Sequence, residues 1–226
     1  MSRYRHEDKY IIDEFQKAII SVRADGVLTK DSHAGDEGYY IIRSIYLDDL
    51  NGRCYYENLN GTDPRAKYRI RYYGNDVEYI SLEKKTKRRG MTLKESARLS
   101  YDECTSLMQG NYICYSGTDD VKRKLLSEVE MLGLAPRSIV TYKRIPYIYR
   151  AGNVRITFDS ELTSSNEINR FLDGDYRQRP VFSNGSLVLE VKWDEILPRF
   201  IKDTFHIDNL QKTAFSKYSM CRAYHL

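Results

Sequence analysis

The sequence predicts an α+β protein built on eight mostly antiparallel strands, with helices inserted between them. In six segments charged residues occupy every second position, as in Lys67, Arg69 and Arg71, with apolar or aromatic residues between them. This alternation is typical of strands with one polar and one apolar face. Turn signals at 72–76, 87–90 and 151–153 are short enough to join antiparallel neighbours. Segments with helical periodicity separate several of the strands.

Each element is expected from a local pattern. Strand patterns cover residues 4–12, 39–48, 67–73, 77–87, 92–99, 138–149, 154–159 and 187–193. Helical periodicity covers 13–23, 101–109, 120–132, 197–205 and 209–223, with a turn near 166–172. Ser100 is the expected N-cap of the second helix, and Pro198 suits the first turn of the fourth. With no repeat or linker, residues 1–226 are expected to form a single domain.

Positive charge is concentrated on the polar faces of these strands. The chain has 36 Lys and Arg against 32 Asp and Glu, a net charge of +4. The polar faces carry twelve basic and five acidic residues, a net charge of +7, so the remainder of the chain is slightly acidic. The basic residues are Arg5, Lys9, Lys67, Arg69, Arg71, Lys85, Lys87, Lys94, Arg98, Arg144, Arg155 and Lys192. The acidic residues are Glu7, Asp48, Glu83, Asp159 and Glu190.

Two architectures are compatible with these patterns. In a sandwich the charged face would meet water, where ion pairs contribute little. In a closed barrel the apolar faces would pack beneath the helices and the charged face would line the lumen. A charged lumen is tolerable only if it is wet, pairs its charges or holds a counter-ion. A ligand with many negative charges would explain the repeated pattern.

Several protein classes are disfavoured. No apolar run reaches the roughly 18 residues of a membrane helix, and the start of the chain lacks the apolar core of a signal peptide. We therefore expect a cytoplasmic protein without direct membrane insertion. The aromatic residues alternate away from the basic face, so a nucleic-acid partner is not expected. The cysteines lack metal-binding spacing, which fits a reducing compartment. They are Cys54, Cys104, Cys114 and Cys221.

An ordered series of motifs covers nearly the whole chain. In order they are RHEDKYII, RSIYLDD, KYRIRYYG, LEKK, YKRIPY, VRITFDSELT, LEVKW and FSKY. The series resembles the polyphosphate polymerase (VTC) domain of the triphosphate tunnel metalloenzyme superfamily. VRITFDSELT and LEVKW indicate the polyphosphate branch instead of the adenylate cyclase and thiamine triphosphatase branch. The resemblance implies a closed eight-stranded antiparallel barrel, with helices outside, that binds a nucleotide triphosphate and a growing polyphosphate chain.

The resemblance also implies which cations bind phosphate. Arginine binds phosphate oxygens in pairs and lysine acts as a movable charge, so a mixed lining suits a flexible polyanion. The residues expected to act on the transferred phosphate are Arg69, Arg71, Arg144 and Lys85. The other expected substrate-binding residues are Arg5, Lys9, Lys67, Lys94, Arg155, Lys192, Lys212 and Lys217. Lys87 and Arg98 are expected in solvated salt bridges instead.

Carboxylates on the same face suit a divalent cation. Mn²⁺ or Mg²⁺ commonly takes only one or two protein carboxylates and completes its shell with water and phosphate. Glu190 matches the metal-binding glutamate of the family's LEVK strand. Glu7 and Asp159 are further metal candidates, with the alternative that they hold Lys9 or Arg155 in place.

Other positions carry weaker expectations. Glu83 is expected to orient Lys85, and Asp48 is expected to be either structural or a ligand. The C-terminal motif departs from the family, because Ala214 stands where a lysine is usual. We expect Lys212 to substitute for that lysine.

The function implied is that of a phosphotransferase. The γ-phosphate of ATP would pass to a polyphosphate chain, whose anionic end needs no strong base. One alternative is a metal-dependent triphosphatase or polyphosphatase, with Glu7 or Glu83 as the base that activates water. Another is a non-catalytic module that binds polyphosphate or inositol phosphates. A membrane-protein partner could carry the polymer away.

Overall fold

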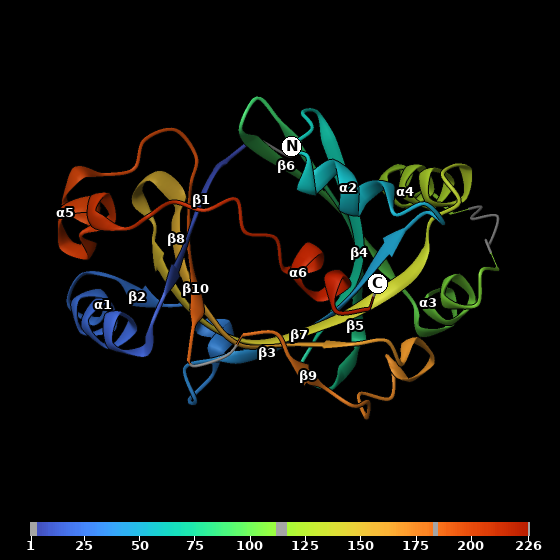
Figure 1. The fold of residues 1–226 in the computed structure, drawn as a ribbon, viewed down its shortest axis with the longest axis horizontal. Helices are drawn as coiled ribbons and strands as arrows, with labels where there is room; N and C mark the ends of the chain where they lie inside the picture. The colour runs from blue at the N-terminus through green and yellow to red at the C-terminus, as the bar shows by residue number, and fades with distance from the viewer. Residues whose placement is uncertain (1–3, 112–116, 183–184, 226) are drawn as a thin grey trace.

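The fold is built on one curled antiparallel sheet. The computed structural model describes residues 4–111, 117–182 and 185–225. The strands lie in the order β1-β10-β8-β7-β3-β4-β5-β6, as Figure 1 shows, and all eight expected strands are present. Short β2 pairs with β7, and short β9 pairs with β8. The strands are β1 (His6–Ile12), β2 (Thr29–Lys30), β3 (Tyr40–Asp48), β4 (Arg65–Tyr73), β5 (Asp76–Arg88), β6 (Met91–Leu99), β7 (Ala135–Tyr149), β8 (Val154–Ser165), β9 (Arg179–Pro180) and β10 (Leu187–Trp193).

The sheet is a half-barrel, so the prediction of a closed barrel is wrong. Within the described residues, the two ends of the sheet meet at one isolated bridge between Arg5, which precedes β1, and Thr92 of β6, whose backbone groups form two reciprocal hydrogen bonds of 2.9 Å. Farther along β1 the free edge has a different partner, because the Thr213 N–H donates to the Lys9 carbonyl at 2.8 Å. A C-terminal segment thus occupies the edge that β6 would need for closure.

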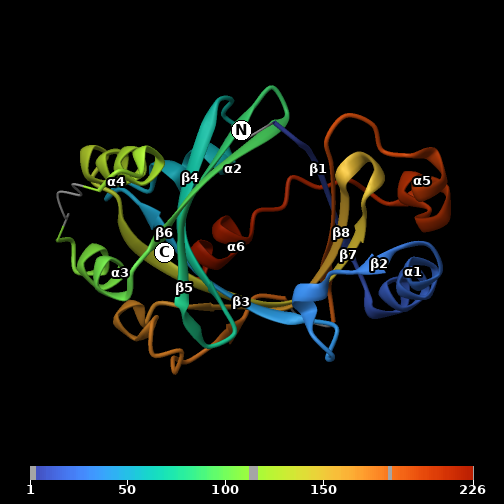
Figure 2. The ribbon, with the colours of Figure 1, turned by 180° about the vertical axis from the view of Figure 1, so that it is seen from behind.

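Helices cover both ends of the convex face (Figure 2). Helices α1 (Glu14–Val27) and α5 (Arg199–Phe205) pack over β1, β8 and β10, and α3 (Tyr101–Met108) and α4 (Asp120–Met131) pack over β4 to β6. Ser100 caps α3 as expected, since its hydroxyl accepts from the Glu103 N–H. Pro198 is the N-cap of α5 instead of a residue of its first turn. The expected turn near 166–172 is a 3₁₀ turn at Ile168–Arg170.

The C-terminal region differs from its prediction. One helix was expected at 209–223, but a 3₁₀ turn at Ile207–Asn209 leads into an extended segment before α6 (Lys217–Ala223). Pairing of this segment with β1 explains its extended form. Helix α6 lies inside the curl of the sheet (Figure 1), where Tyr218 stacks on Tyr46 of β3 and belongs to an apolar cluster with Val140 and Tyr142. Part of the concave face is therefore apolar where α6 covers it.

Helix α2 (Arg53–Leu59) was not expected. The Asp48 carboxylate accepts hydrogen bonds from the backbone N–H groups of Cys54 and Tyr55 at 2.8 and 3.1 Å, and from the Tyr218 hydroxyl at 2.6 Å. Asp48 is thus a structural residue that joins β3, α2 and α6. No helix in the described ranges has the length and apolar character needed to cross a membrane. Cys54, Cys104 and Cys221 are buried free thiols, and Cys114 lies outside the described residues.

Candidate functional site

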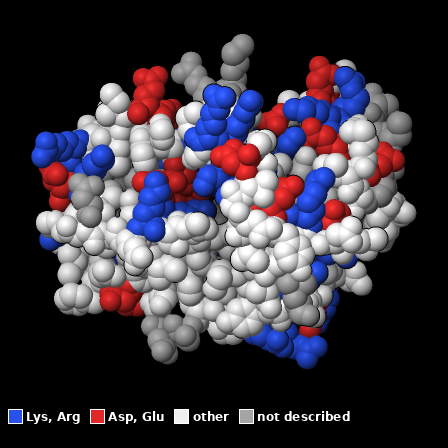
Figure 3. Space-filling model, turned by 45° about the horizontal axis from the view of Figure 1, so that its top comes forward, with Lys and Arg blue, Asp and Glu red and all other residues white. Residues whose placement is uncertain are grey.

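The candidate site lies on the concave face of the sheet. On β4, Lys67, Arg69 and Arg71 contact groups of this face, whereas the apolar residues between them are buried in the outer core. The predicted alternation is therefore confirmed for this strand. Figure 3 shows basic and acidic side chains beside one another at the upper centre of the molecule. Their pairing forms three clusters.

Glu83 on β5 is the centre of the first cluster. Its carboxylate lies 2.8 Å from Arg69 Nη2, 2.6 Å from Arg71 Nη2 and 2.8 Å from Lys94 Nζ. Burial alone would raise the pKa of Glu83, but the charges of Arg69 and Arg71 outweigh it and hold the pKa below its usual range. The prediction that Glu83 orients Lys85 is wrong, because Lys85 binds another carboxylate.

That carboxylate is Glu7 on β1, which starts the second cluster. Lys85 Nζ lies 2.7 and 2.6 Å from the two Glu7 oxygens. Lys9 Nζ lies 2.9 Å from Glu7 and 3.7 Å from Glu190, so this ammonium group stands between two carboxylates. Burial would raise the pKa of Glu7, but Lys85 and Lys9 lower it to about 2. Lys192 Nζ lies 2.8 Å from Glu190, and burial lowers the pKa of Lys192 to about 8.

Asp159 on β8 is the centre of the third cluster. Arg144 binds it through two hydrogen bonds of 2.6 Å, and Lys217 Nζ of α6 lies 2.6 Å from the same carboxylate. The prediction that Asp159 holds Arg155 in place is wrong. Arg144 Nη2 also lies 3.2 Å from Glu190, which connects this cluster to the second one. Tyr142 presents its ring to both Arg144 and Lys217, a contact that sequence reasoning missed.

Three predicted cations lie apart from these clusters, each paired with an aspartate. The pairs are Arg5–Asp194 at 2.7 Å, Arg155–Asp31 at 2.8 Å and Lys212–Asp8. The prediction for Arg98 is also corrected, because it donates to the Glu78 carbonyl at 3.0 Å and lies over the Tyr79 ring. Lys87, expected in a solvated salt bridge, makes no ion pair with a carboxylate of the described residues and lines a cavity.

Two adjoining cavities follow the clusters and share Lys9, Lys67 and Lys85. The smaller, of about 80 Å³, is called here the arginine-lined cavity. Its further cations are Arg69, Arg144, Lys192 and Lys217, and its acid is Glu190. The larger, of about 240 Å³, is called the lysine-rich cavity. Its further cations are Arg65, Lys87 and Lys212, and its acid is Glu7.

Sequence reasoning missed three neutral or basic groups at these cavities. Arg65 continues the alternation of β4, so a strand begun two residues earlier would have revealed it. Asn58 and Ser216 both bind Lys67 Nζ, the latter at 2.6 Å. Asn58 belongs to the unexpected helix α2, and no sequence signal connects it with β4. Lys67 thus has neutral partners, and burial followed by the charges of Lys9 and Lys85 holds its pKa well below the usual range.

Solved structures share this curled antiparallel fold. A candidate adenylate cyclase from Bacillus halodurans is 14% identical with a TM-score of 0.53, covering 92% of this chain and 88% of that one. A Hippeastrum protein described as having a dominant triphosphatase activity is 12% identical with a TM-score of 0.53, covering 100% and 97%. PH1012 protein from Pyrococcus horikoshii is 10% identical with a TM-score of 0.51, covering 96% and 98%.

The family of the chain is defined by its sequence. The VTC domain family matches residues 4–226, and the chain therefore belongs to that family. This confirms the resemblance that the strand motifs indicated. Among curated proteins no sequence match was found.

The superfamily that the sequence motifs resemble implies a divalent cation. The described residues contain no group of three or more carboxylate, histidine or cysteine side chains placed to hold a metal. Glu190 nevertheless fits a cation of this kind, because its Oε1 lies 3.7 Å from Lys9 Nζ while Arg144 and Lys192 bind its other oxygen, and Mg²⁺ needs only one or two carboxylates. Glu7 lies close by, but Lys85 already binds both of its oxygens. Asp159 fits less well, since Arg144 and Lys217 already bind both of its oxygens.

Proposed function

We propose that this protein is a polyphosphate polymerase that transfers the γ-phosphate of ATP to a polyphosphate chain. The terminal phosphate oxygen of the chain attacks the γ-phosphorus in line. The bond between that phosphorus and the β,γ-bridging oxygen breaks, and ADP leaves. Membership of the VTC domain family and the paired cations of the concave face support this proposal.

The ion pairs of the carboxylates carry the choice of reaction, because Lys85 binds both oxygens of Glu7, and Arg69, Arg71 and Lys94 bind Glu83. A general base works best when its pKa is near the working pH. Glu7 has a pKa of about 2, and that of Glu83 is also below its usual range. Both carboxylates are therefore weak bases, poorly suited to activating water. Attack by an anionic phosphate oxygen requires no base, so the site suits transfer between phosphates better than hydrolysis.

The cations then supply positioning and charge neutralisation. Arg69, Arg71 and Arg144 present guanidinium forks held by buried carboxylates, which fixes their directions before a phosphate enters. Lys9 and Lys85, each held by Glu7, offer their remaining N–H groups to phosphate oxygens. Holding two polyanions in line against their mutual repulsion is the main catalytic task in phosphoryl transfer.

Glu190, with Glu7 beside it, is the proposed ligand of Mn²⁺ or Mg²⁺. A bound divalent cation would add positive charge where the donor phosphates and the acceptor meet. The buried free thiols Cys54, Cys104 and Cys221 support a cytoplasmic location, since reducing compartments preserve thiols. A membrane-protein partner that removes the polymer is compatible with this proposal.

A triphosphatase is the second candidate, favoured by the likeness in fold to the Hippeastrum protein. In that reaction water replaces the acceptor chain and orthophosphate is the labelled product. The two candidates use the same cations and differ in the acceptor. Product analysis therefore separates them.

The test is incubation of the purified protein with γ-³²P-ATP and Mn²⁺ or Mg²⁺, with and without a short polyphosphate primer. A ladder of labelled polymer is expected with the natural protein. Arg71→Ala should abolish the ladder, because the variant lacks a guanidinium group that Glu83 holds on the concave face. The matched control is Arg98→Ala, an exposed arginine that touches none of the three clusters and should leave the ladder intact. Labelled orthophosphate alone would show a triphosphatase, and binding without turnover would show a polyphosphate-binding module.

A further inference from the structure

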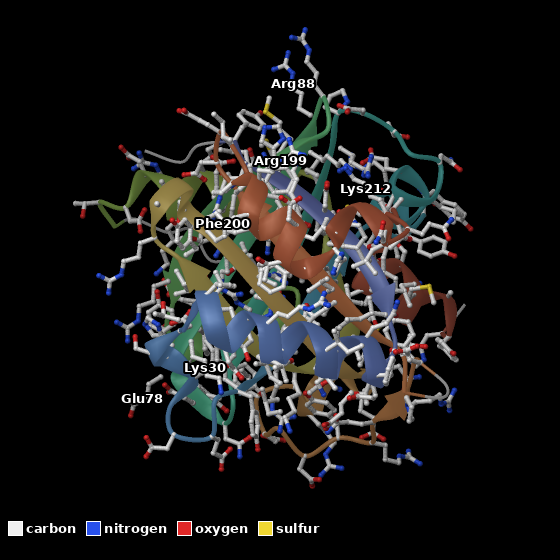
Figure 4. All side chains as sticks on the ribbon, turned by 90° about the vertical axis from the view of Figure 1, so that its left-hand side faces the viewer. Lys30, Glu78, Arg88, Arg199, Phe200 and Lys212 are labelled. Atoms are coloured by element: carbon white, nitrogen blue, oxygen red, sulfur yellow. The ribbon has the colours of Figure 1, made fainter. Side chains whose placement is uncertain are left out.

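Lys67 of β4 and Ser216 meet where the extended C-terminal segment reaches the arginine-lined cavity. Thr213 of that segment is bonded to the backbone of Lys9, and Figure 4 shows Lys212 on the same segment. On the concave face, Lys67 Nζ lies 2.6 Å from Ser216 Oγ, and both residues line the arginine-lined cavity. The hydroxyl therefore lies among the cations proposed to hold the phosphates of ATP.

The surroundings of Lys67 favour a neutral amine. Among the described residues, its Nζ makes hydrogen bonds to two neutral groups, Asn58 Oδ1 and Ser216 Oγ. Burial lowers the pKa of Lys67 well below its usual range, and nearby positive charges lower it further. Those charges belong to Lys9, Lys85 and Arg65. A neutral amine donates from an N–H to Asn58 Oδ1 and accepts the Ser216 proton at its lone pair.

The other contacts of Ser216 Oγ leave its proton free to bond Lys67. The backbone N–H and the hydroxyl of Ser219 both donate to this oxygen, at 3.3 and 3.2 Å. A hydroxyl has one proton and two lone pairs, so these two donors use its acceptor positions. A nucleophile bonded to a base, with the base oriented by a third group, is the usual arrangement for covalent catalysis. Ser216, Lys67 and Asn58 have this arrangement.

We propose that Ser216 is a nucleophile that takes the γ-phosphate of ATP, and that Lys67 is its base. The Ser216 proton passes to Lys67 Nζ and the bond from Oγ to phosphorus forms. The bond between that phosphorus and the β,γ-bridging oxygen breaks, and ADP leaves. The phosphoserine has the anionic oxygens that an acceptor needs, so it starts a chain when no primer is present. The inference rests on the proposed function in that ATP is the donor.

A purely structural bond between β4 and the start of α6 is the alternative reading of this contact. Arginine in place of Lys67 decides between the two. It keeps the positive charge and the N–H donors, but it stays protonated and accepts no proton. A structural or phosphate-binding cation would tolerate this change, whereas a base would not.

The experiment incubates the full chain with γ-³²P-ATP and Mn²⁺ without primer, and peptide mass spectrometry locates the label that stays with the denatured protein. Acid-stable label is expected on Ser216. Ser216→Ala should lose it, and the matched control Ser127→Ala, which removes an exposed hydroxyl of α4, should retain it. Lys67→Arg should be labelled at least about 100-fold more slowly. Its affinity for a non-hydrolysable ATP analogue should change by less than about threefold.

Absence of label, label on another residue such as Lys67, or labelling of Lys67→Arg at the natural rate would overturn the inference. If Ser216→Ala folds poorly, Ser216→Asn keeps an oxygen for the Ser219 N–H and still lacks the nucleophile.

The same reactions separate this inference from the proposed function. Polymer growth on an added primer by a protein that forms no phosphoserine would support the polymerase and overturn the nucleophile. Phosphoserine at residue 216 with orthophosphate as the sole released labelled product would support the nucleophile and reject the polymerase.

Discussion

Arg144 and Asp159 face one another across β7 and β8 and are joined by two parallel hydrogen bonds of 2.6 Å. The side chains are 8% and 0% exposed, so water contributes little to either charge. Lys217 of α6 binds the same carboxylate. One buried acid therefore fixes a guanidinium of the sheet and connects it with the helix inside the curl.

Removing this acid should destabilise the fold. In Asp159→Ala, Arg144 and Lys217 would both lose their buried counter-charge, and the free energy of unfolding should fall by about 3 to 5 kcal/mol. Urea unfolding followed by circular dichroism measures the change. Asp36→Ala, on the exposed loop before β3, is the control and should stay within about 0.5 kcal/mol. A loss below about 1 kcal/mol would show that the pair contributes little to stability.

Removing the charge of Glu83 should make stability depend on phosphate. Glu83→Gln keeps the shape of the side chain but leaves Arg69, Arg71 and Lys94 without their shared anion. The variant should have a lower Tm than the natural protein. Added tripolyphosphate should raise its Tm by more than it raises that of the natural protein, because the ligand binds the folded state and replaces the missing charge. Equal shifts in the two proteins would contradict this account.

Affinity for triphosphate should fall as pH rises through about 8. Burial lowers the pKa of Lys192 to about 8, and a bound anion favours the protonated ammonium. The positive charge of Lys192 is therefore present below about pH 8 and lost above it. The measurement is the Kd of tripolyphosphate at several pH values on both sides of this pKa. Lys192→Arg stays protonated throughout and corrects for titration of the ligand. Identical pH profiles for the two proteins would exclude Lys192 as the titrating group.

Without ligand, the opposed cations of the lysine-rich cavity should lower stability. Lys87→Gln removes one member of the Arg65–Lys87 pair and should raise the free energy of unfolding by about 0.2 to 1 kcal/mol in phosphate-free buffer. The gain should shrink at high salt, which screens the repulsion. A variant less stable than the natural protein would mean that packing of the Lys87 stem outweighs the repulsion.

The metal assignment can be tested by binding alone. With tripolyphosphate present, Mn²⁺ should raise the Tm of the natural protein, because a cation shared by carboxylate and phosphate binds only the folded state. Glu190→Gln should lose most of this rise. Glu161→Gln, an exposed glutamate of β8, should retain it. An unchanged rise of Tm in Glu190→Gln would show that another residue binds the metal.

The fold could be read from the sequence where a local pattern determines it. Alternation placed Lys67, Arg69 and Arg71 on one face, and the capping pattern at Ser100 began α3 at the right residue. The prediction of a closed barrel was wrong, because closure depends on whether Thr213 or β6 pairs with the edge of β1. Two partners far apart in sequence compete there, and no local pattern reports the result.

The candidate site shows the same limit. The sequence motifs identified Arg144 and Glu190 as residues of the candidate site. Which acid pairs with which cation, however, depends on the distances between strands. Lys85 lies two residues after Glu83 in sequence but binds Glu7, because β1 and β5 approach each other across the curl. Asn58 had no sequence signal, since its helix exists through the contacts of Asp48.

The incomplete seam between β1 and β6 affects how a long product of the proposed reaction can leave. A chain enclosed by a continuous ring of strands must be drawn out by one end, and its full length must pass the same opening. Here the side of the half-barrel is held by the backbone bonds of the Arg5–Thr92 pair, by the Lys85–Glu7 ion pair between β5 and β1, and by the contacts of Lys212 and Thr213 with β1. Parting these contacts would free a chain made by the proposed reaction sideways, in a single step whose difficulty does not grow with its length.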